Sequence, residues 1–170
     1  MIKGVICGKG GQGVITLNAM IGTLASGLGL SAISAETHGM AMRGGSVATY
    51  IKIGEGQSAS VALGDGDFII SLTRDEALRN LPYLRRGGVL ILDTEDKTAI
   101  EGDFRIISLD ATGTANEKFG NKILAGQILL GAFLGCFRGL DVDKALEILK
   151  NAPKINIDAV KYGVENAQTV

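Results

Sequence analysis

The sequence is poor in several residue types that often carry chemistry. Its 170 residues include no tryptophan, one histidine and two cysteines, and neither cysteine belongs to a C-x-x-C pair. A self-contained iron–sulfur or zinc site is therefore not expected in this chain. Cys7 and Cys136 lie far apart in apolar surroundings, which is typical of buried, reduced thiols in a cytoplasmic protein.

The net charge of the chain is small, and its uncharged apolar segments are short. The formal net charge is −1 and no stretch concentrates Lys or Arg, so binding to nucleic acid or to an anionic membrane is not expected as the main function. The longest uncharged helical segment, residues 123–137, is shorter than the ~20 residues that span a bilayer, which favours a buried helix. The first residues, MIKGVIC, are expected to form a strand and not a signal peptide. These features favour one cytoplasmic globular domain over residues 1–170.

Hydrophobic periodicity predicts an alternation of strands and helices. The expected strands cover residues 2–7, 31–36, 46–53, 68–72, 89–93 and 104–109. The expected helices cover residues 14–28, 73–84, 121–138 and 141–151, with a tail after Pro153. Apolar strands that alternate with helices indicate an α/β fold, a Rossmann-like three-layer domain with a mostly parallel sheet and helices on both faces.

A glycine-rich segment follows the first expected strand. Gly8, Gly10 and Gly13 have the spacing G-x-G-x-x-G, and Gly11 adds another residue without a side chain. Main-chain N–H groups that converge at a helix N-terminus, together with the helix dipole, favour an anion at such a junction. The alternative is that the glycines only let the helix pack closely against the sheet.

Three polar residues accompany this segment. Lys9 is either a phosphate partner or an ordinary exposed loop lysine. Gln12 has no apolar reason to occupy its position, so a contact with a ligand or a partner chain is expected. Glu36, at the end of the second strand, takes the place where a dinucleotide-binding fold holds the ribose, although it follows Gly13 by 23 residues.

The loop after the second strand, residues 37–45, supplies the other half of the candidate site. His38, the single histidine, is either structural or directed at a ligand. Arg43, beside Gly44 and Gly45, suits a bidentate contact with a carboxylate or phosphate, or an ion pair across a subunit interface. Because parallel strands end at one edge of a sheet, we expect this loop and the glycine segment to form one composite surface. No nucleophile–base pair, paired carboxylates or metal triad stands out, so no catalytic residue is assigned and the chain is expected to position chemistry carried out elsewhere.

Two segments together carry a family resemblance. "GKGGQGVIT", followed by "ETHGMAMRGGSV", resembles the gamma-type domain of the 2-oxoacid:ferredoxin oxidoreductases, in particular the small (beta) subunit of the indolepyruvate ferredoxin oxidoreductases. A third segment, "DFIISLTRDEALRNLPYLRRGGVLILDT", is also similar to that family and extends the resemblance over the chain to about Gly139.

The resemblance implies a subunit of a multi-component enzyme. Such an enzyme decarboxylates a 2-oxo acid oxidatively with thiamine diphosphate, Mg²⁺ and coenzyme A, and it passes electrons through iron–sulfur clusters to ferredoxin. In the family, larger subunits or other domains carry the thiamine diphosphate and the clusters, so the isolated chain is expected to be inactive. The "GDG" at residues 64–66 resembles part of a thiamine diphosphate motif, but Asp93 occupies the region where that motif needs an asparagine. We therefore interpret residues 64–66 as a turn.

Two other functions are open from the sequence. The glycine spacing and Glu36 suit a stand-alone dinucleotide-binding oxidoreductase. The uncharged segments, residues 10–35 and 123–137, suit a non-catalytic assembly scaffold. The favoured hypothesis is an oxidoreductase subunit that completes the active site or holds coenzyme A through its glycine segment and has no redox cofactor of its own.

Overall fold

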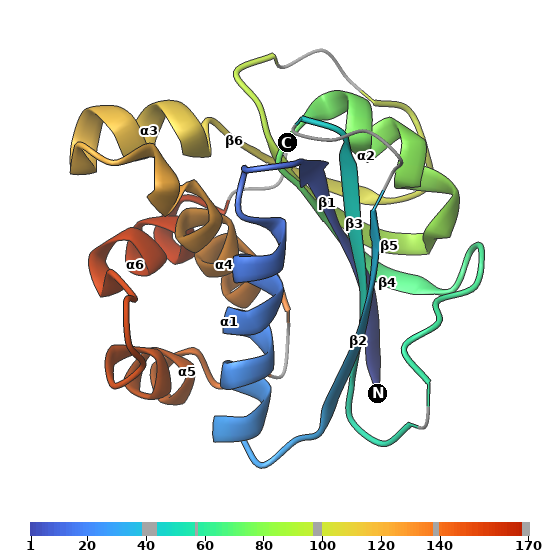
Figure 1. Ribbon diagram of the computed structural model, residues 1–170, viewed down its shortest axis with the longest axis horizontal. Coiled ribbons are helices and arrows are strands. Elements are labelled where there is room, and N and C mark those ends of the chain that lie inside the picture. The colour runs from blue at the N-terminus through green and yellow to red at the C-terminus, as the bar shows by residue number, and fades with distance from the viewer. Residues whose placement is uncertain (39–43, 57, 97–99, 138–139, 168–170) are drawn as a thin grey trace.

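The structure is a computed structural model that describes residues 1–38, 44–56, 58–96, 100–137 and 140–167 (Figure 1). The strands are β1 (Ile2–Lys9), β2 (Ala32–His38), β3 (Ser46–Ile53), β4 (Gly66–Ser71), β5 (Leu84–Asp93) and β6 (Arg105–Leu109). The helices are α1 (Val14–Gly27), α2 (Arg74–Asn80), α3 (Ala111–Phe119), α4 (Ala125–Cys136), α5 (Val142–Lys150) and α6 (Ile157–Asn166). Two short 3₁₀ segments, η1 (Leu81–Tyr83) and η2 (Lys122–Leu124), precede β5 and α4.

The strands form one sheet in the order β2-β3-β1-β4-β5-β6. β1, β4, β5 and β6 pair in parallel, whereas β3 runs antiparallel to both of its neighbours. The chain leaves β1 through α1 toward the β2 edge, and it leaves β4 through α2 toward the β6 edge. The carboxyl ends of β1 and β4 therefore form a topological switch point, where open α/β sheets place their ligands.

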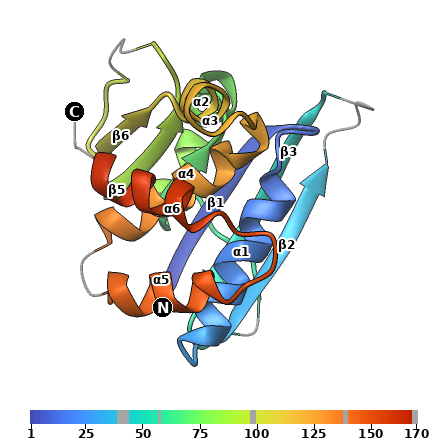
Figure 2. The same cartoon turned by 90° about the vertical axis from the view of Figure 1, so that its left-hand side faces the viewer.

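Helices cover both faces of the sheet unequally. α1, α3, α4, α5 and α6 lie on one face, and α2 lies on the other (Figures 1 and 2). Alternate strand residues point to the two faces: Ile6 and Phe68 pack with the five-helix side, whereas Val5 and Ile69 pack with α2. α4 is buried along nearly its whole length, which confirms the buried helix expected over residues 123–137. The three-layer, mostly parallel α/β fold is thus confirmed.

Local sequence signals set several of the boundaries. Thr73 begins α2 by accepting a hydrogen bond from the N–H of Glu76, and Asp141 begins α5 in the same way through Lys144. The helix expected over residues 73–84 is shorter than predicted, because α2 ends at Asn80 and a 3₁₀ turn containing Pro82 follows. The sequence analysis assigned no helix to residues 111–119 or 157–166, where the structure has α3 and α6.

Candidate functional site

The glycine loop, residues 8–13, joins β1 to α1 and is closed by its own polar groups. The N–H of Lys9 donates to Oε1 of Gln12 at 2.6 Å, and the N–H of Gln12 donates to the carbonyl of Lys9 at 3.1 Å. The amide oxygen of Gln12 therefore stabilises the turn itself. A ligand or partner contact by Gln12, as expected from the sequence, would have to come from the other part of its side chain.

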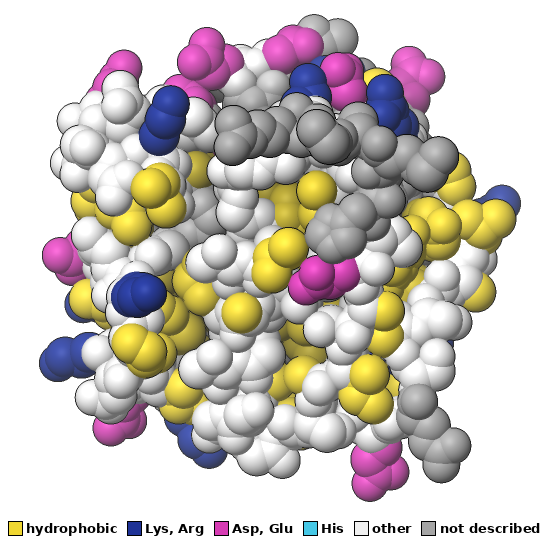
Figure 3. Space-filling model, in the orientation of Figure 1, with side chains coloured by type: hydrophobic (Ala, Val, Ile, Leu, Met, Phe, Trp, Pro, Cys, Tyr) yellow, Lys and Arg dark blue, Asp and Glu magenta, His cyan; other side chains and the backbone are white. Residues whose placement is uncertain are grey.

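The first turn of α1 lacks the side-chain cap that most helices of this chain have. Gly13 precedes α1 with φ 91°, a left-handed conformation that favours glycine, and no side chain caps this end. The first turn contains no acidic residue, and Figure 3 shows mostly uncharged side chains over α1, with one acidic side chain near the middle of this face. By contrast, side chains of their own N-cap residues bond to the first turns of α2, α3, α5 and α6. The N-terminus of α1 therefore keeps a partial positive charge that no side chain of its own cap or first turn offsets.

An open cleft of about 390 Å³ adjoins this helix end at the switch point of the sheet. The residues that line the cleft are Gly10, Gly11, Gln12, Gly13, Leu72, Thr112, Lys122, Ile123 and Ala125. Ala125 is the first residue of α4, which continues directly from η2: the side chain of Asn121 accepts the N–H of Ile123, and the N–H of Ala125 donates to the carbonyl of Lys122. The uncapped end of α1 and one lysine thus line the same cleft, which is a favourable environment for an anionic group.

A buried carboxylate at the end of β5 holds the α3 wall of the cleft. Asp93 accepts hydrogen bonds from the N–H groups of Ala111 (2.8 Å) and Thr112 (3.1 Å) and from the hydroxyl of Thr112 (2.5 Å). Burial raises the pKa of Asp93 above its ordinary value, and these hydrogen bonds counteract part of that rise. Because Thr112 gives its hydroxyl proton to Asp93, its oxygen can accept a hydrogen bond from a ligand hydroxyl or amino group.

A second hollow of about 290 Å³ lies against the other side of the glycine loop. Its lining residues are Lys9, Gly11, Gly13, Val14, Ile15, Thr16 and Val47. Lys9 is exposed at this hollow and does not line the larger cleft. The glycine loop therefore has accessible space on both sides.

The glycine loop and the end of the second loop touch through their main chains. The N–H of Gly10 donates to the carbonyl of Gly45 at 2.8 Å, and a Cβ atom on Gly10 would lie 3.2 Å from the nitrogen of Gly44. Gly10 thus lies beside Gly44 and Gly45 at the carboxyl edge of the sheet, and the composite surface expected from the sequence stays a prediction. The roles of the candidate residues remain predictions.

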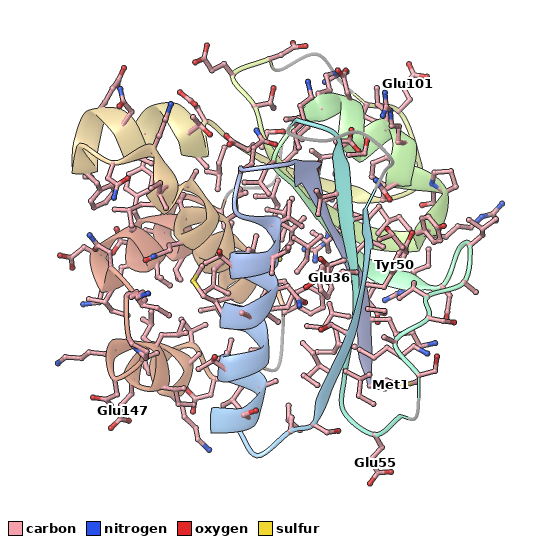
Figure 4. All side chains as sticks on the ribbon, viewed as in Figure 1. Met1, Glu36, Tyr50, Glu55, Glu101 and Glu147 are labelled. Carbon is pink, nitrogen blue, oxygen red and sulfur yellow. The ribbon has the colours of Figure 1, made fainter. Side chains whose placement is uncertain are left out.

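Glu36 lies on β2, which is separated by β3 from β1, the strand that leads into the glycine loop. β3 separates β2 from β1, and Glu36 is level with Thr49 of β3 and, beyond it, Ile6 of β1. In a dinucleotide-binding fold the strand that carries the ribose-binding acid is the direct neighbour of the first strand. Glu36 points into the space between α1 and the sheet edge (Figure 4). His38 ends β2, but its side chain and the whole of Arg43 lie outside the described part of the chain.

The remaining sequence candidates have structural roles. The "GDG" segment is a turn, as interpreted from the sequence: Asp65 pairs with Lys3 at 2.6 Å, and the N–H of Gly64 donates to the carbonyl of Pro82.

Burial raises the pKa of Cys7 to about 12 and that of Cys136 to about 11. Among the described residues, no three His, Cys, Asp or Glu side chains are grouped so that they could hold a metal ion. No helix within the described ranges is long and apolar enough to cross a membrane.

The side of the cleft formed by Thr112, Lys122 and Ile123 is not predicted from the sequence. These residues lie far from the glycine loop in the chain, and nothing in their spacing links them to it. One local signal was present: Lys122 stands at the beginning of a helical segment, where the helix dipole disfavours a cation. A lysine in that position suggests that an anion shares the site.

Comparison with known proteins gives consistent results. A family model described as "Pyruvate ferredoxin/flavodoxin oxidoreductase" matches residues 4–166. The indolepyruvate oxidoreductase subunit IorB of Thermococcus kodakarensis is 33% identical over 96% of this chain and 95% of its own length. Among solved structures, the gamma subunit of a keto/oxoacid ferredoxin oxidoreductase from Geobacter sulfurreducens superimposes with a TM-score of 0.80 and 25% identity, covering 98% of both chains. A 2-oxoglutarate:ferredoxin oxidoreductase from Magnetococcus marinus, with 2-oxoglutarate, coenzyme A and succinyl-CoA bound, matches with a TM-score of 0.71 and 16% identity, covering 98% of this chain and 29% of that one.

Proposed function

The chain belongs to the pyruvate ferredoxin/flavodoxin oxidoreductase family, and from this membership we propose that it is a small subunit of a 2-oxoacid:ferredoxin oxidoreductase complex. Full-length similarity to an indolepyruvate oxidoreductase subunit favours an aryl 2-oxo acid such as indolepyruvate as the substrate of that complex. The complex decarboxylates the 2-oxo acid, transfers the acyl group to coenzyme A and delivers two electrons to ferredoxin.

In this proposal larger partner subunits carry the thiamine diphosphate and the iron–sulfur clusters. Iron–sulfur clusters are usually held by four cysteine thiolates. This chain has two cysteines, both buried and both with a raised pKa, so they do not fit a cluster. The pairing of Asp65 with Lys3 likewise does not fit a thiamine-bound metal ion. The chain's own contribution is therefore binding and positioning.

The cleft at the switch point is the proposed site for the phosphorylated end of coenzyme A. The observation that carries this assignment is that the uncapped N-terminus of α1 and Lys122 line one open cleft. The phosphate oxygens would accept hydrogen bonds from the N–H groups of Gly11 and Gly13, and Lys122 would place a positive charge beside them. The Thr112 oxygen would accept from a ribose hydroxyl or an adenine amino group, and Leu72 and Ile123 would provide apolar contacts. Coenzyme A supplies the thiol that accepts the acyl group, and this subunit holds it by its other end.

Kinetics of the assembled complex test this assignment. The chain should be co-expressed with a thiamine-binding subunit of such a complex, and 2-oxo-acid-dependent reduction of ferredoxin should be measured as coenzyme A is varied. Lys122→Gln should raise KM for coenzyme A about tenfold, since a hydrogen bond to a charged group contributes roughly 1.5–3 kcal/mol. Lys150→Gln, on the exposed end of α5, is the matched control and should leave KM unchanged.

Two results would refute the proposal at different levels. If the chain forms no complex with the thiamine-binding subunit, and its omission leaves ferredoxin reduction intact, the assignment as a subunit is wrong. If the complex needs the chain but Lys122→Gln and Lys150→Gln behave alike, the coenzyme A site is not in this cleft and the chain acts as an assembly scaffold.

A further inference from the structure

A buried carboxylate on α2 reaches the beginning of β3. Glu76 is 3% exposed, and its Oε1 accepts the hydroxyl proton of Ser46 at 2.7 Å. Nη1 of Arg79 donates to the oxygen of Ser46 at 2.8 Å and lies 3.3 Å from the same Glu76 oxygen. The Ser46 hydroxyl thus donates to one side chain and accepts from the other. We call this group of three residues the Ser46 tether.

The Ser46 tether continues through the main chain to the proposed cleft. Ser46 directly follows Gly45, whose carbonyl accepts the N–H of Gly10 at 2.8 Å. Gly10 lines the cleft, and its Cα approaches Gly44 so closely that a Cβ atom would lie 3.2 Å from the Gly44 nitrogen. Because these main chains are in direct contact, a shift of residues 44–46 has to move the glycine loop as well.

The Ser46 tether crosses from one face of the sheet to the other. α2 lies on the face opposite α1, whereas the glycine loop leads directly into α1 (Figure 1). Glu76 therefore connects the α2 layer, through Ser46 and Gly45, to the loop that begins α1.

Stability alone gives little reason for this arrangement. Removing a carboxylate from water is costly, and its partner Arg79 has a side chain that is 68% exposed, so solvent screens the attraction between them. α2 is already anchored by the Thr73 cap and by Ala77, which is fully buried against the sheet. An ion pair with only its carboxylate buried is better explained by the geometry that it imposes on Ser46.

We infer that Glu76 and Arg79 are positioning residues for the glycine loop: through Ser46 they fix Gly45, and through Gly45 they fix Gly10 at the wall of the cleft. The effect on coenzyme A rests on the function proposed above. The effect on the Gly10 amide does not, since it follows from the hydrogen bonds of this chain alone.

The test compares Ser46→Ala with a matched control at the other end of the same sheet. Ser31→Ala removes a similar hydroxyl, which donates to the carbonyl of Gly54; Ser31 precedes β2 and Gly54 follows β3, at the edge of the sheet opposite the cleft. In the full-length chain, Ser46→Ala should speed hydrogen exchange of the Gly10 amide about tenfold, whereas Ser31→Ala should leave it unchanged. In the assembled complex, Ser46→Ala should raise KM for coenzyme A several-fold with kcat retained. Glu76→Gln keeps an oxygen that accepts from Ser46 and should change KM less than Ser46→Ala.

Each combination of results decides the inference. Unchanged exchange at Gly10 in Ser46→Ala overturns it outright. Faster exchange with an unchanged KM, while Lys122→Gln raises KM, shows that the Ser46 tether is only structural and also overturns it. If KM responds to neither Ser46→Ala nor Lys122→Gln, the coenzyme A assignment fails as well. Faster exchange together with a raised KM, both absent in Ser31→Ala, supports the positioning role.

Discussion

The same substitution at two glycines of α1 should change stability in opposite directions. Gly13 caps the helix with φ 91°, whereas Gly22 lies inside it with no positive φ. A Cβ atom at either position would meet no other atom within 4 Å, so neither alanine creates a collision. The expected difference therefore comes from the backbone conformation alone.

The magnitudes follow from that conformation. Gly13→Ala forces a residue with a Cβ atom into the left-handed region, which costs about 1–2 kcal/mol. Gly22→Ala adds the best helix former to a helix interior and should stabilise by about 1 kcal/mol. Both variants lose one glycine from the unfolded chain, so that contribution cancels in the comparison. The free energies of unfolding of the two variants should differ by about 2–3 kcal/mol.

Urea unfolding of the two variants, followed by circular dichroism, measures this difference directly. The unfolding midpoint of Gly13→Ala should lie below that of the unaltered chain, and the midpoint of Gly22→Ala should lie above it. Equal midpoints for the two variants, or a more stable Gly13→Ala, would show that the glycine loop does not need a left-handed residue before α1.

Three further substitutions or conditions test the core and the cleft wall. Phe68→Ala should lower the free energy of unfolding by about 3–5 kcal/mol, because the buried ring of Phe68 packs against that of Phe133 with 4.7 Å between their centroids. Denaturant unfolding measures this loss, and a loss below about 1 kcal/mol would contradict the packing. Since burial raises the pKa of Cys7 to about 12 and of Cys136 to about 11, above the ~8.5 of an unfolded thiol, the free energy of unfolding should fall as pH rises from about 9 to 11. Replacing both cysteines by alanine should flatten that pH dependence, and an unchanged slope would assign it to other groups. Asp93→Asn should destabilise the protein less than Asp93→Ala, because asparagine keeps an oxygen that can accept the N–H groups of Ala111 and Thr112. Thermal unfolding measures both variants, and equal losses would show that these two hydrogen bonds do not hold the beginning of α3.

The parts of the fold with strong local periodicity could be predicted from the sequence. β3 was predicted at its exact bounds, since Val47, Thr49, Ile51 and Ile53 alternate with more exposed residues. Its antiparallel direction and its place between β1 and β2 could not be predicted, because alternation determines which residues share a face and not which strands pair. Because of that insertion, β2, which carries Glu36, is not the direct neighbour of β1.

α3 and α6 were missed because their burial depends on small residues. In α3 only Ala111 and Ala115 are buried, so no apolar stripe marks the helix. α6 meets α4 where Gly163 and Gly131 face each other with their backbones in contact, which produces close packing without a hydrophobic signal. Both helices depend on contacts made by distant parts of the chain. The Asp93 bonds to the beginning of α3 are one such contact.

The candidate site was predictable in its location but not in its distribution of hydrogen bonds. The spacing of the glycines indicated a set of free N–H groups at the beginning of α1. In the structure the N–H of Gly10 is used by Gly45 and that of Gln12 by Lys9, and both bonds depend on the three-dimensional course of the main chain. The N–H groups that remain for the proposed anion are therefore those of Gly11, Gly13 and the first turn of α1.

The missing cap of α1 connects the local sequence to the proposed binding role. A side-chain cap typically stabilises a helix by about 1 kcal/mol, and this chain uses Thr73, Asp110, Asp141 and Asn156 for that purpose in other helices. Gly13 makes no such bond at the beginning of α1, where the helix adjoins the cleft that Lys122 also lines. The N–H groups left without a cap can then bond to an anion that arrives from outside the chain, and their dipole adds to its binding free energy. On the proposed function, Gly13 therefore lowers the stability of the free subunit slightly and raises the affinity of the site for its anionic ligand.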